Sequence, residues 1–72
     1  MKDFNGMKWS DLTQEEKDLL MSEARTVDAR NDQSVSDGEC VIDLLYPYSV
    51  SGRVVDGEII VDQEAVIYNP EA

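Results

Sequence analysis

Carboxylates are the side chains of this chain that occur often enough, and closely enough in sequence, to do chemistry together. Sixteen Asp and Glu stand against six Lys and Arg, so the formal net charge is 6 − 16 = −10. One group falls on a predicted helix and another in the segment after it, and these are the candidate partner-binding residues: Glu15, Glu16, Asp18, Glu23, Asp28, Asp32 and Asp37. Carboxylates in such numbers can hold a metal ion, transfer protons or bind a basic surface.

Metal binding is the first of these uses that the sequence argues against. Counted from Asp28, a calcium loop of the EF-hand type needs an oxygen ligand at its third position and glycine at its sixth. The chain has Arg30 and Gln33 at these positions. With Cys40 as the only cysteine and no histidine, a zinc site lacks its usual ligands. We therefore expect no metal and no cofactor.

Catalysis is the second use that the residue types argue against. Without histidine the chain lacks the commonest general base, and neither a Ser-His-Asp nor a Cys-His arrangement can be built. Cys40 lies in an apolar run, which predicts a buried, unreactive thiol. The four glycines are isolated from one another and form no phosphate-binding loop. Since a sheet of this size offers little room for a desolvated cleft, we expect the protein not to be an enzyme.

Binding to a basic partner is the third use, and the charge favours it. A net charge of −10 repels DNA, RNA and anionic membranes, and it speeds association with basic surfaces. A nucleic-acid-binding groove presents Lys and Arg to phosphates, which fixed carboxylates can replace. We predict an inhibitor or decoy, in effect a nucleic-acid mimic, that blocks such a surface on another protein. The alternative is that the charge only keeps a small protein in solution.

A β-hairpin is the clearest of the elements that must position these side chains. Asp56-Gly57 stands between two runs of β-branched residues, and this dipeptide favours a type I′ turn with positive φ at both central residues. A two-residue loop fixes the register within 49–62, beginning with Val55 opposite Glu58. Because side chains alternate along a strand, one face becomes the core face. That face carries Val50, Val54, Ile59 and Val61.

A helix precedes the hairpin in the predicted plan. Thr13 and Glu16 have the spacing of a capping box, and apolar residues recur at helical intervals after it, which predicts a helix over 13–30. The apolar stripe of this helix consists of Leu20, Ala24 and Val27, widened by Leu19. Such a narrow stripe suits a helix that lies on a sheet.

The remaining segments complete one domain over 1–72. The run 39–46 predicts a central strand in which Cys40, Ile42, Leu44 and Tyr46 share one face. Because proline has no amide donor, Tyr46-Pro47-Tyr48 either joins two strands or makes a corner. The segment 65–68 is either a last short strand or packs along the sheet edge, so the sheet spans 39–68. With a lead-in over 1–10 and a loose tail over 69–72, the fold class is α+β. One N-terminal helix packs on a three- to four-stranded antiparallel sheet.

Two other functions stay open at this point. A non-enzymatic adaptor, or a homodimer, would bind through an aromatic patch formed by Phe4, Trp9, Tyr46 and Tyr48, although Phe4 and Trp9 equally suit the end of a core. An immunity protein or antitoxin would use the acidic chemistry of the decoy. In size, acidity and simple plan, the chain resembles the short acidic proteins with which phages block host enzymes or defence systems. No export signal precedes the helix, so we expect a cytoplasmic protein, in the host cytoplasm if it is viral.

Overall fold

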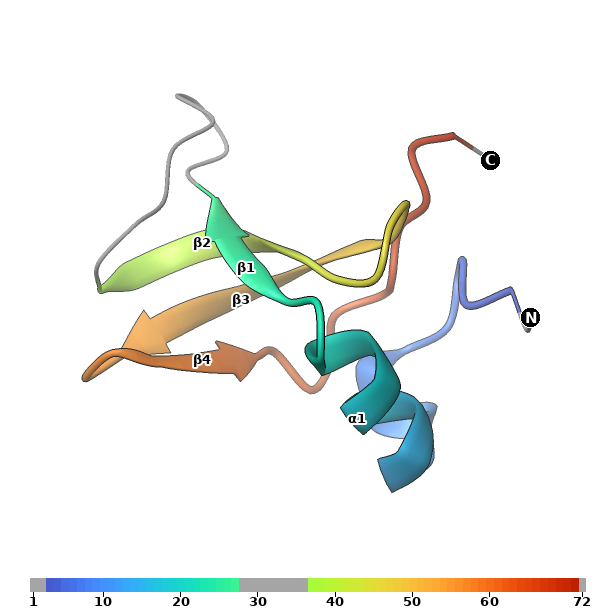
Figure 1. Cartoon of the computed structure of the whole chain (residues 1–72), viewed down its shortest axis with the longest axis horizontal. Helices are drawn as coiled ribbons and strands as arrows, with labels where there is room; N and C mark the ends of the chain where they lie inside the picture. The colour runs from blue at the N-terminus through green and yellow to red at the C-terminus, as the bar shows by residue number, and fades with distance from the viewer. Residues whose placement is uncertain (1–2, 28–36, 72) are drawn as a thin grey trace.

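A computed structural model describes residues 3–27 and 37–71, which form a short helix and a curled antiparallel sheet (Figure 1). The elements are a 3-10 turn η1 (Trp9–Asp11), α1 (Gln14–Met21), β1 (Arg25–Val27), β2 (Gly38–Asp43), β3 (Ser49–Val55) and β4 (Glu58–Val61). The strands lie in the order β1-β2-β3-β4, and each neighbouring pair is antiparallel. The predicted α+β class is confirmed. No described helix is long and apolar enough to cross a membrane.

The hairpin of β3 and β4 has the predicted register. Val55 pairs with Glu58, and the ladder continues to Gly52 opposite Val61. Both turn residues have positive φ, 52° at Asp56 and 81° at Gly57, as a type I′ turn requires. On the predicted core face, Val50, Val54 and Val61 are buried. The fourth residue of that face, Ile59, is half-buried.

The helix begins as predicted but ends early. Thr13 Oγ1 accepts from the amide of Glu16 at 3.1 Å, and the Glu16 carboxylate accepts from the amide of Thr13 at 2.9 Å, which completes the capping box. The prediction of a helix over 13–30 is wrong beyond Met21, because a turn follows and β1 then pairs with β2. Pairing with β2 gives the β-branched residues of β1 a ladder partner, which overrides the helical spacing. Residues 28–30 lie outside the described part of the chain.

The predicted strand over 39–46 is also shorter than expected. β2 ends at Asp43, so the prediction of a strand that continues to Tyr46 is wrong, and Tyr46 is 77% exposed. The chain turns instead: the amide of Leu44 donates to the Tyr48 carbonyl at 3.0 Å, and the Tyr48 amide donates to Leu45 at 3.1 Å. The cis peptide bond between Tyr46 and Pro47 lies within this turn. Tyr46-Pro47-Tyr48 thus lies in the connection between β2 and β3, which agrees with the expectation that it joins two strands or makes a corner.

The C-terminal segment packs between the lead-in and the start of β3. Tyr68 exchanges two backbone hydrogen bonds with Ser49, at 2.8 and 2.9 Å. On its other side, Ile67 donates to the Met7 carbonyl at 2.8 Å and accepts from the Gly6 amide at 2.9 Å. Of the two expectations for 65–68, a last short strand or a segment along the sheet edge, the structure shows the second, because these residues form only isolated bridges. The same bridges attach the lead-in to the sheet.

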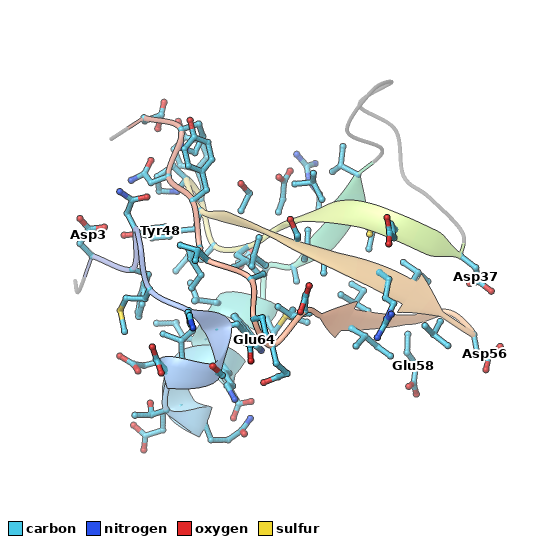
Figure 2. The ribbon with its side chains drawn as sticks, turned by 180° about the vertical axis from the view of Figure 1, so that it is seen from behind. Asp3, Asp37, Tyr48, Asp56, Glu58 and Glu64 are labelled. Carbon is cyan, nitrogen blue, oxygen red and sulfur yellow. The ribbon has the colours of Figure 1, made fainter. Side chains whose placement is uncertain are left out.

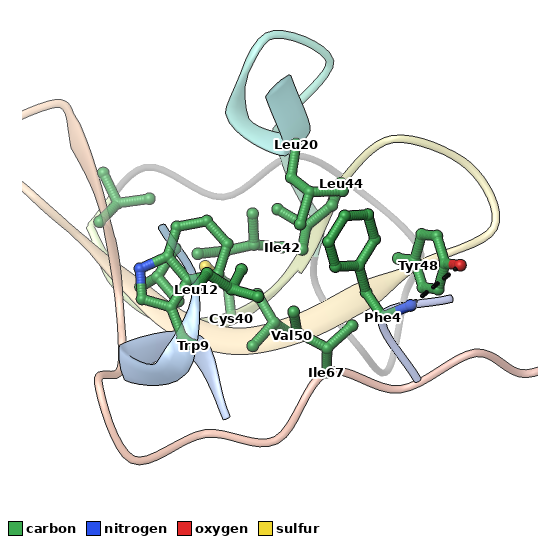
Figure 3. Close-up of a cluster of buried hydrophobic side chains, with 12 residues drawn as sticks. Phe4, Trp9, Leu12, Leu20, Cys40, Ile42, Leu44, Tyr48, Val50 and Ile67 are labelled. Atoms are coloured by element: carbon green, nitrogen blue, oxygen red, sulfur yellow. Dashed lines mark hydrogen bonds between the residues drawn. The ribbon is translucent and has the colours of Figure 1, made fainter. Parts of the chain in front are cut away.

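The core contains both aromatic residues of the lead-in (Figure 3). Phe4 is 2% exposed and Trp9 is 4% exposed, so they close the core, and the interpretation of either as an exposed anchor is wrong. Phe4 meets Tyr48 edge to face, with ring centroids 5.5 Å apart. The Tyr48 hydroxyl accepts from the Phe4 amide at 3.2 Å and donates to the Asp3 carboxylate at 3.2 Å. Leu20 is the buried side chain that α1 contributes to this core, and the half-buried Met21 packs against it.

Candidate acidic interaction surface

Carboxylates dominate the surface of the described residues. Asp28, Asp32, Lys2 and Arg30 lie outside them, which leaves 16 − 2 = 14 acidic and 6 − 2 = 4 basic side chains. None of the described charged side chains is buried. Two of the seven predicted contact residues, Asp28 and Asp32, therefore have no described place. The other five fall into three separate positions.

The first position is α1, where three predicted contact residues lie within its first turn and a half. Glu15 is exposed and stands in the first turn, where the helix dipole favours a negative charge. Glu16 is half-buried and serves as the reciprocal member of the capping box. Asp18 accepts a hydrogen bond from Gln14 Nε2 at 2.9 Å. Two of these three carboxylates thus already support the helix that carries them.

The second position lies just beyond α1, where the chain enters β1. Glu23 is exposed there and lines an open groove with Arg25 and Asp43. Arg25 Nε donates to Asp43 Oδ2 at 3.1 Å, across the first pair of the β1–β2 ladder. The carboxylate of Glu23 therefore belongs to a different surface from the acidic residues of α1.

The third position is the tip of the β3–β4 hairpin, at the opposite end of the sheet from α1 (Figures 1 and 2). Asp37 Oδ1 accepts from the Gly57 amide at 3.4 Å, which places this residue against the turn. Asp56 occupies the turn itself, and Glu58 is the first residue of β4; both are exposed. Figure 2 shows these three carboxylates gathered at one end of the molecule. We name this group of Asp37, Asp56 and Glu58 the tip cluster.

Sequence reasoning missed two members of the tip cluster. The sequence identifies Asp56 as a turn residue and Glu58 as a register residue of the hairpin. The type I′ turn also exposes both carboxylates, which makes them candidates for binding. The place of Asp37 depends on the register of β2 against β3, in which Gly38 lies opposite Val54. The connection between β2 and β3, residues 44–48, contains no turn dipeptide of defined type, so this register had no local signal in the sequence.

The four described cations are spread over the molecule and do not neutralise the tip cluster. Lys8 pairs with Glu64 at 3.6 Å, Arg25 pairs with Asp43, and Arg53 stands opposite Glu39 in the ladder. Lys17 lies on α1. Among the described residues, no cation comes within ion-pair distance of the tip cluster.

The described residues offer little basis for other chemistry. They contain no group of three or more His, Cys, Asp or Glu side chains placed to hold a metal ion. Cys40 is a free thiol at 9% exposure, and burial raises its pKa, which disfavours the reactive thiolate. The charged surface is the feature that distinguishes this molecule.

Comparison of the chain with protein-family models, with curated proteins and with solved structures gave no match. The functional argument accordingly depends on the physical properties of the surface.

Proposed function

We propose that the protein binds a basic, nucleic-acid-binding surface of another protein and blocks it by presenting carboxylates where phosphates would lie. The observation that carries this proposal is the surplus of fourteen acidic over four basic side chains in the described residues, none of them buried. A field of one sign steers association with an oppositely charged surface and repels nucleic acid itself.

The positions of the carboxylates support a mimic over a flexible acidic tail. Residues of the tip cluster stand on a type I′ turn and beside it, and those of α1 stand on a capped helix. Carboxylates on regular elements lose less conformational freedom on binding than those on a disordered arm, so more of the electrostatic attraction is retained as affinity. The same chemistry would serve an immunity protein or antitoxin that neutralises a basic toxin.

The adaptor alternative requires an exposed patch of four aromatic residues, and most of that patch is buried. Three of the four aromatic residues of the expected patch, Phe4, Trp9 and Tyr48, are buried, and Tyr46 alone is exposed. A homodimer stays a prediction, and sedimentation equilibrium of the purified protein tests it directly.

Affinity capture tests the proposed function. Tagged protein is incubated with lysate of its source cell at low and moderate salt, and the bound proteins are identified by mass spectrometry. We expect a nucleic-acid-binding protein that is captured less well as salt increases and that added DNA or RNA displaces. A partner that is indifferent to salt and to nucleic acid would overturn the proposal.

Two charge variants of equal size show which carboxylates matter. One removes the charges of the tip cluster (D37N, D56N and E58Q), and the other removes three acidic residues near the helix (E15Q, D18N and E23Q). Each variant has three fewer negative charges, so a general effect of net charge weakens capture equally in both. We expect at least one of them to weaken capture and to flatten its salt dependence. Unchanged capture by both would contradict an acidic binding surface.

A further inference from the structure

An open groove of about 490 Å³ lies between the β2–β3 connection, the start of β1 and the C-terminal segment. In Figure 1 the connection and the C-terminal segment lie next to each other, in agreement with the hydrogen bonds between Ser49 and Tyr68. The groove is lined by Glu23, Arg25, Asp43, Leu44, Leu45, Tyr46, Pro47, Tyr48, Ser49 and Pro70. It is separate from the tip cluster, which lies at the other end of the sheet.

The walls of the groove combine apolar residues with charged ones and include one exposed ring. Leu45 and Pro47 are half-buried, and Pro70 faces them from the C-terminal segment. Tyr46 is 77% exposed. A hydrogen bond to Glu71, aided by some desolvation and by the Glu71 charge, raises the pKa of the Tyr46 phenol. The exposure of Tyr46 leaves its ring open to a ligand at the mouth of the groove.

The charges around the groove favour a cation. Glu23 and Asp43 line it. Among the described residues that line the groove, Arg25 is the only cation, and its Nε is already bonded to Asp43 at 3.1 Å. Two carboxylates against one paired guanidinium leave a surplus negative charge on Glu23, so an anionic ligand would be repelled.

We propose that this groove binds an arginine side chain of the basic partner. The inference rests on the proposed function and names the place where one cation of the partner is received. An arginine has an apolar stem that suits the proline and leucine walls, and a planar guanidinium that stacks on a tyrosine ring and bonds a carboxylate at the same time. Lysine offers a compact charge that fits a flat aromatic face less well.

A short peptide tests the groove without the partner. The ¹⁵N-labelled protein is titrated with N-acetylated, C-amidated Gly-Arg-Gly and, as a control, with the same peptide carrying neutral citrulline in place of arginine. We expect the arginine peptide to shift the amide resonances of Glu23, Leu45 and Tyr46, and we expect the citrulline peptide to leave them in place. Equal shifts at the tip cluster would show general attraction to carboxylates and would overturn the groove as a distinct site.

Matched variants measure separately what the Tyr46 ring and the Glu23 charge contribute to binding of the arginine peptide. Tyr46→Ala should weaken binding of the arginine peptide about two- to fivefold, the range for an exposed cation–π contact, whereas Tyr46→Phe keeps the ring and should retain binding. Tyr68→Ala is the control for the ring, because Tyr68 is 60% exposed and does not line the groove. Glu23→Gln should weaken binding, and Glu15→Gln, which removes an equal charge outside the groove, should not.

The peptide experiment can fail while the proposed function stands, and the reverse also holds. If Tyr46→Ala and Glu23→Gln bind the arginine peptide as the unmodified protein does, the groove proposal is wrong. Salt-sensitive capture of a nucleic-acid-binding partner would still stand in that case. If capture fails but the peptide binds in the groove, arginine recognition stands as a local property, and the partner is not a nucleic-acid-binding protein.

Discussion

The two ends of the molecule carry similar charge but use it differently. Near the N-terminus of α1, carboxylates form hydrogen bonds that hold the helix: Glu16 accepts from the Thr13 amide, and Asp18 accepts from Gln14. At the hairpin tip the backbone turn holds the carboxylates: Asp37 accepts from the Gly57 amide at 3.4 Å, and the side chains of Asp56 and Glu58 form no hydrogen bond or ion pair within the described residues. The carboxylates of α1 therefore help to stabilise the helix. The side chains of Asp56 and Glu58 are instead held at the surface by the turn and add no bond to the fold.

This difference decides how charge substitutions should be interpreted. Removing a carboxylate from α1 changes both the charge and a local hydrogen bond, so a loss of binding there mixes two causes. Removing Asp56 or Glu58 changes the charge and leaves the turn, which depends on backbone conformation. The hairpin tip is therefore the better place to measure what charge contributes to binding.

Leu20→Ala should have the largest effect, because this side chain joins α1 to the sheet. Leu20 is fully buried, so its truncation should lower the free energy of unfolding by about 2–5 kcal/mol. Leu19 is 46% exposed on the same helix, and Leu19→Ala should change stability by about 0.5 kcal/mol or less. Urea unfolding followed by the fluorescence of Trp9, the single tryptophan, measures both. Similar losses for the two variants would show that α1 does not dock through Leu20.

Gly52→Ala tests the body of the hairpin, where space is the constraint. A Cβ at this position would stand 2.5 Å from the Ile60 carbonyl oxygen and closer still to the Ile42 side chain. The carbonyl belongs to the ladder and cannot move away without breaking it, so we expect a loss of about 1–3 kcal/mol. Ser51→Ala is the control, because Ser51 is the exposed neighbour on the same strand. A Gly52→Ala protein as stable as the control would mean that β3 and β4 lie farther apart.

Gly57→Val tests the turn that presents the tip cluster, where conformation is the constraint. A Cβ at Gly57 meets nothing within 4 Å, but φ is +81°, which a β-branched residue rarely adopts. We expect a loss of about 1–2 kcal/mol in thermal or urea unfolding. Gly57→Asn should cost less, because Asn tolerates positive φ better than valine does. Equal stability of the two variants would contradict the type I′ turn.

The parts of the fold that local signals determine were predictable from the sequence. The Asp-Gly turn set the register of β3 and β4, and the capping box set the first residue of α1. The end of α1 was not predictable, because Leu20, Ala24 and Val27 fit a helical stripe while residues 25–27 also suit a strand. Pairing with β2 decides in favour of the strand, and the edge of β2 with which β1 pairs forms only in the folded molecule.

The acidic surface was predictable in composition and less so in arrangement. The sequence indicates a surplus of exposed carboxylates, but it groups Asp37 with Asp28 and Asp32 in the segment after the predicted helix. The structure places Asp37 against Gly57 instead, because the β2–β3 register brings the start of β2 beside the hairpin tip. Neighbours in space that are distant in sequence depend on strand pairing, and no short-range pattern encodes it.

Thr13→Ala tests the helix end, where polar side chains hold the structure. The change removes the Oγ1 that accepts from the Glu16 amide and should lower stability by about 1 kcal/mol. Thr13→Ser keeps a hydroxyl in the same place and should recover most of that loss. The two variants are compared by urea unfolding and by amide hydrogen exchange over α1. Faster exchange that is confined to α1 would show that the cap acts locally, and unchanged exchange would contradict its role.

The double variant D56N and E58Q should have the smallest effect on stability and therefore gives the sharpest comparison of the two ends. It lowers the count of acidic residues from 16 to 14 and the net charge from −10 to −8. Since neither carboxylate has a partner within the described residues and Asn tolerates positive φ, the free energy of unfolding should change by about 0.5 kcal/mol or less. Any change at low salt should be a gain, because repulsion within the tip cluster falls, and added salt should remove it. A clear loss of stability would mean that these carboxylates hold the fold as those of α1 do, and the distinction between the two ends would fail.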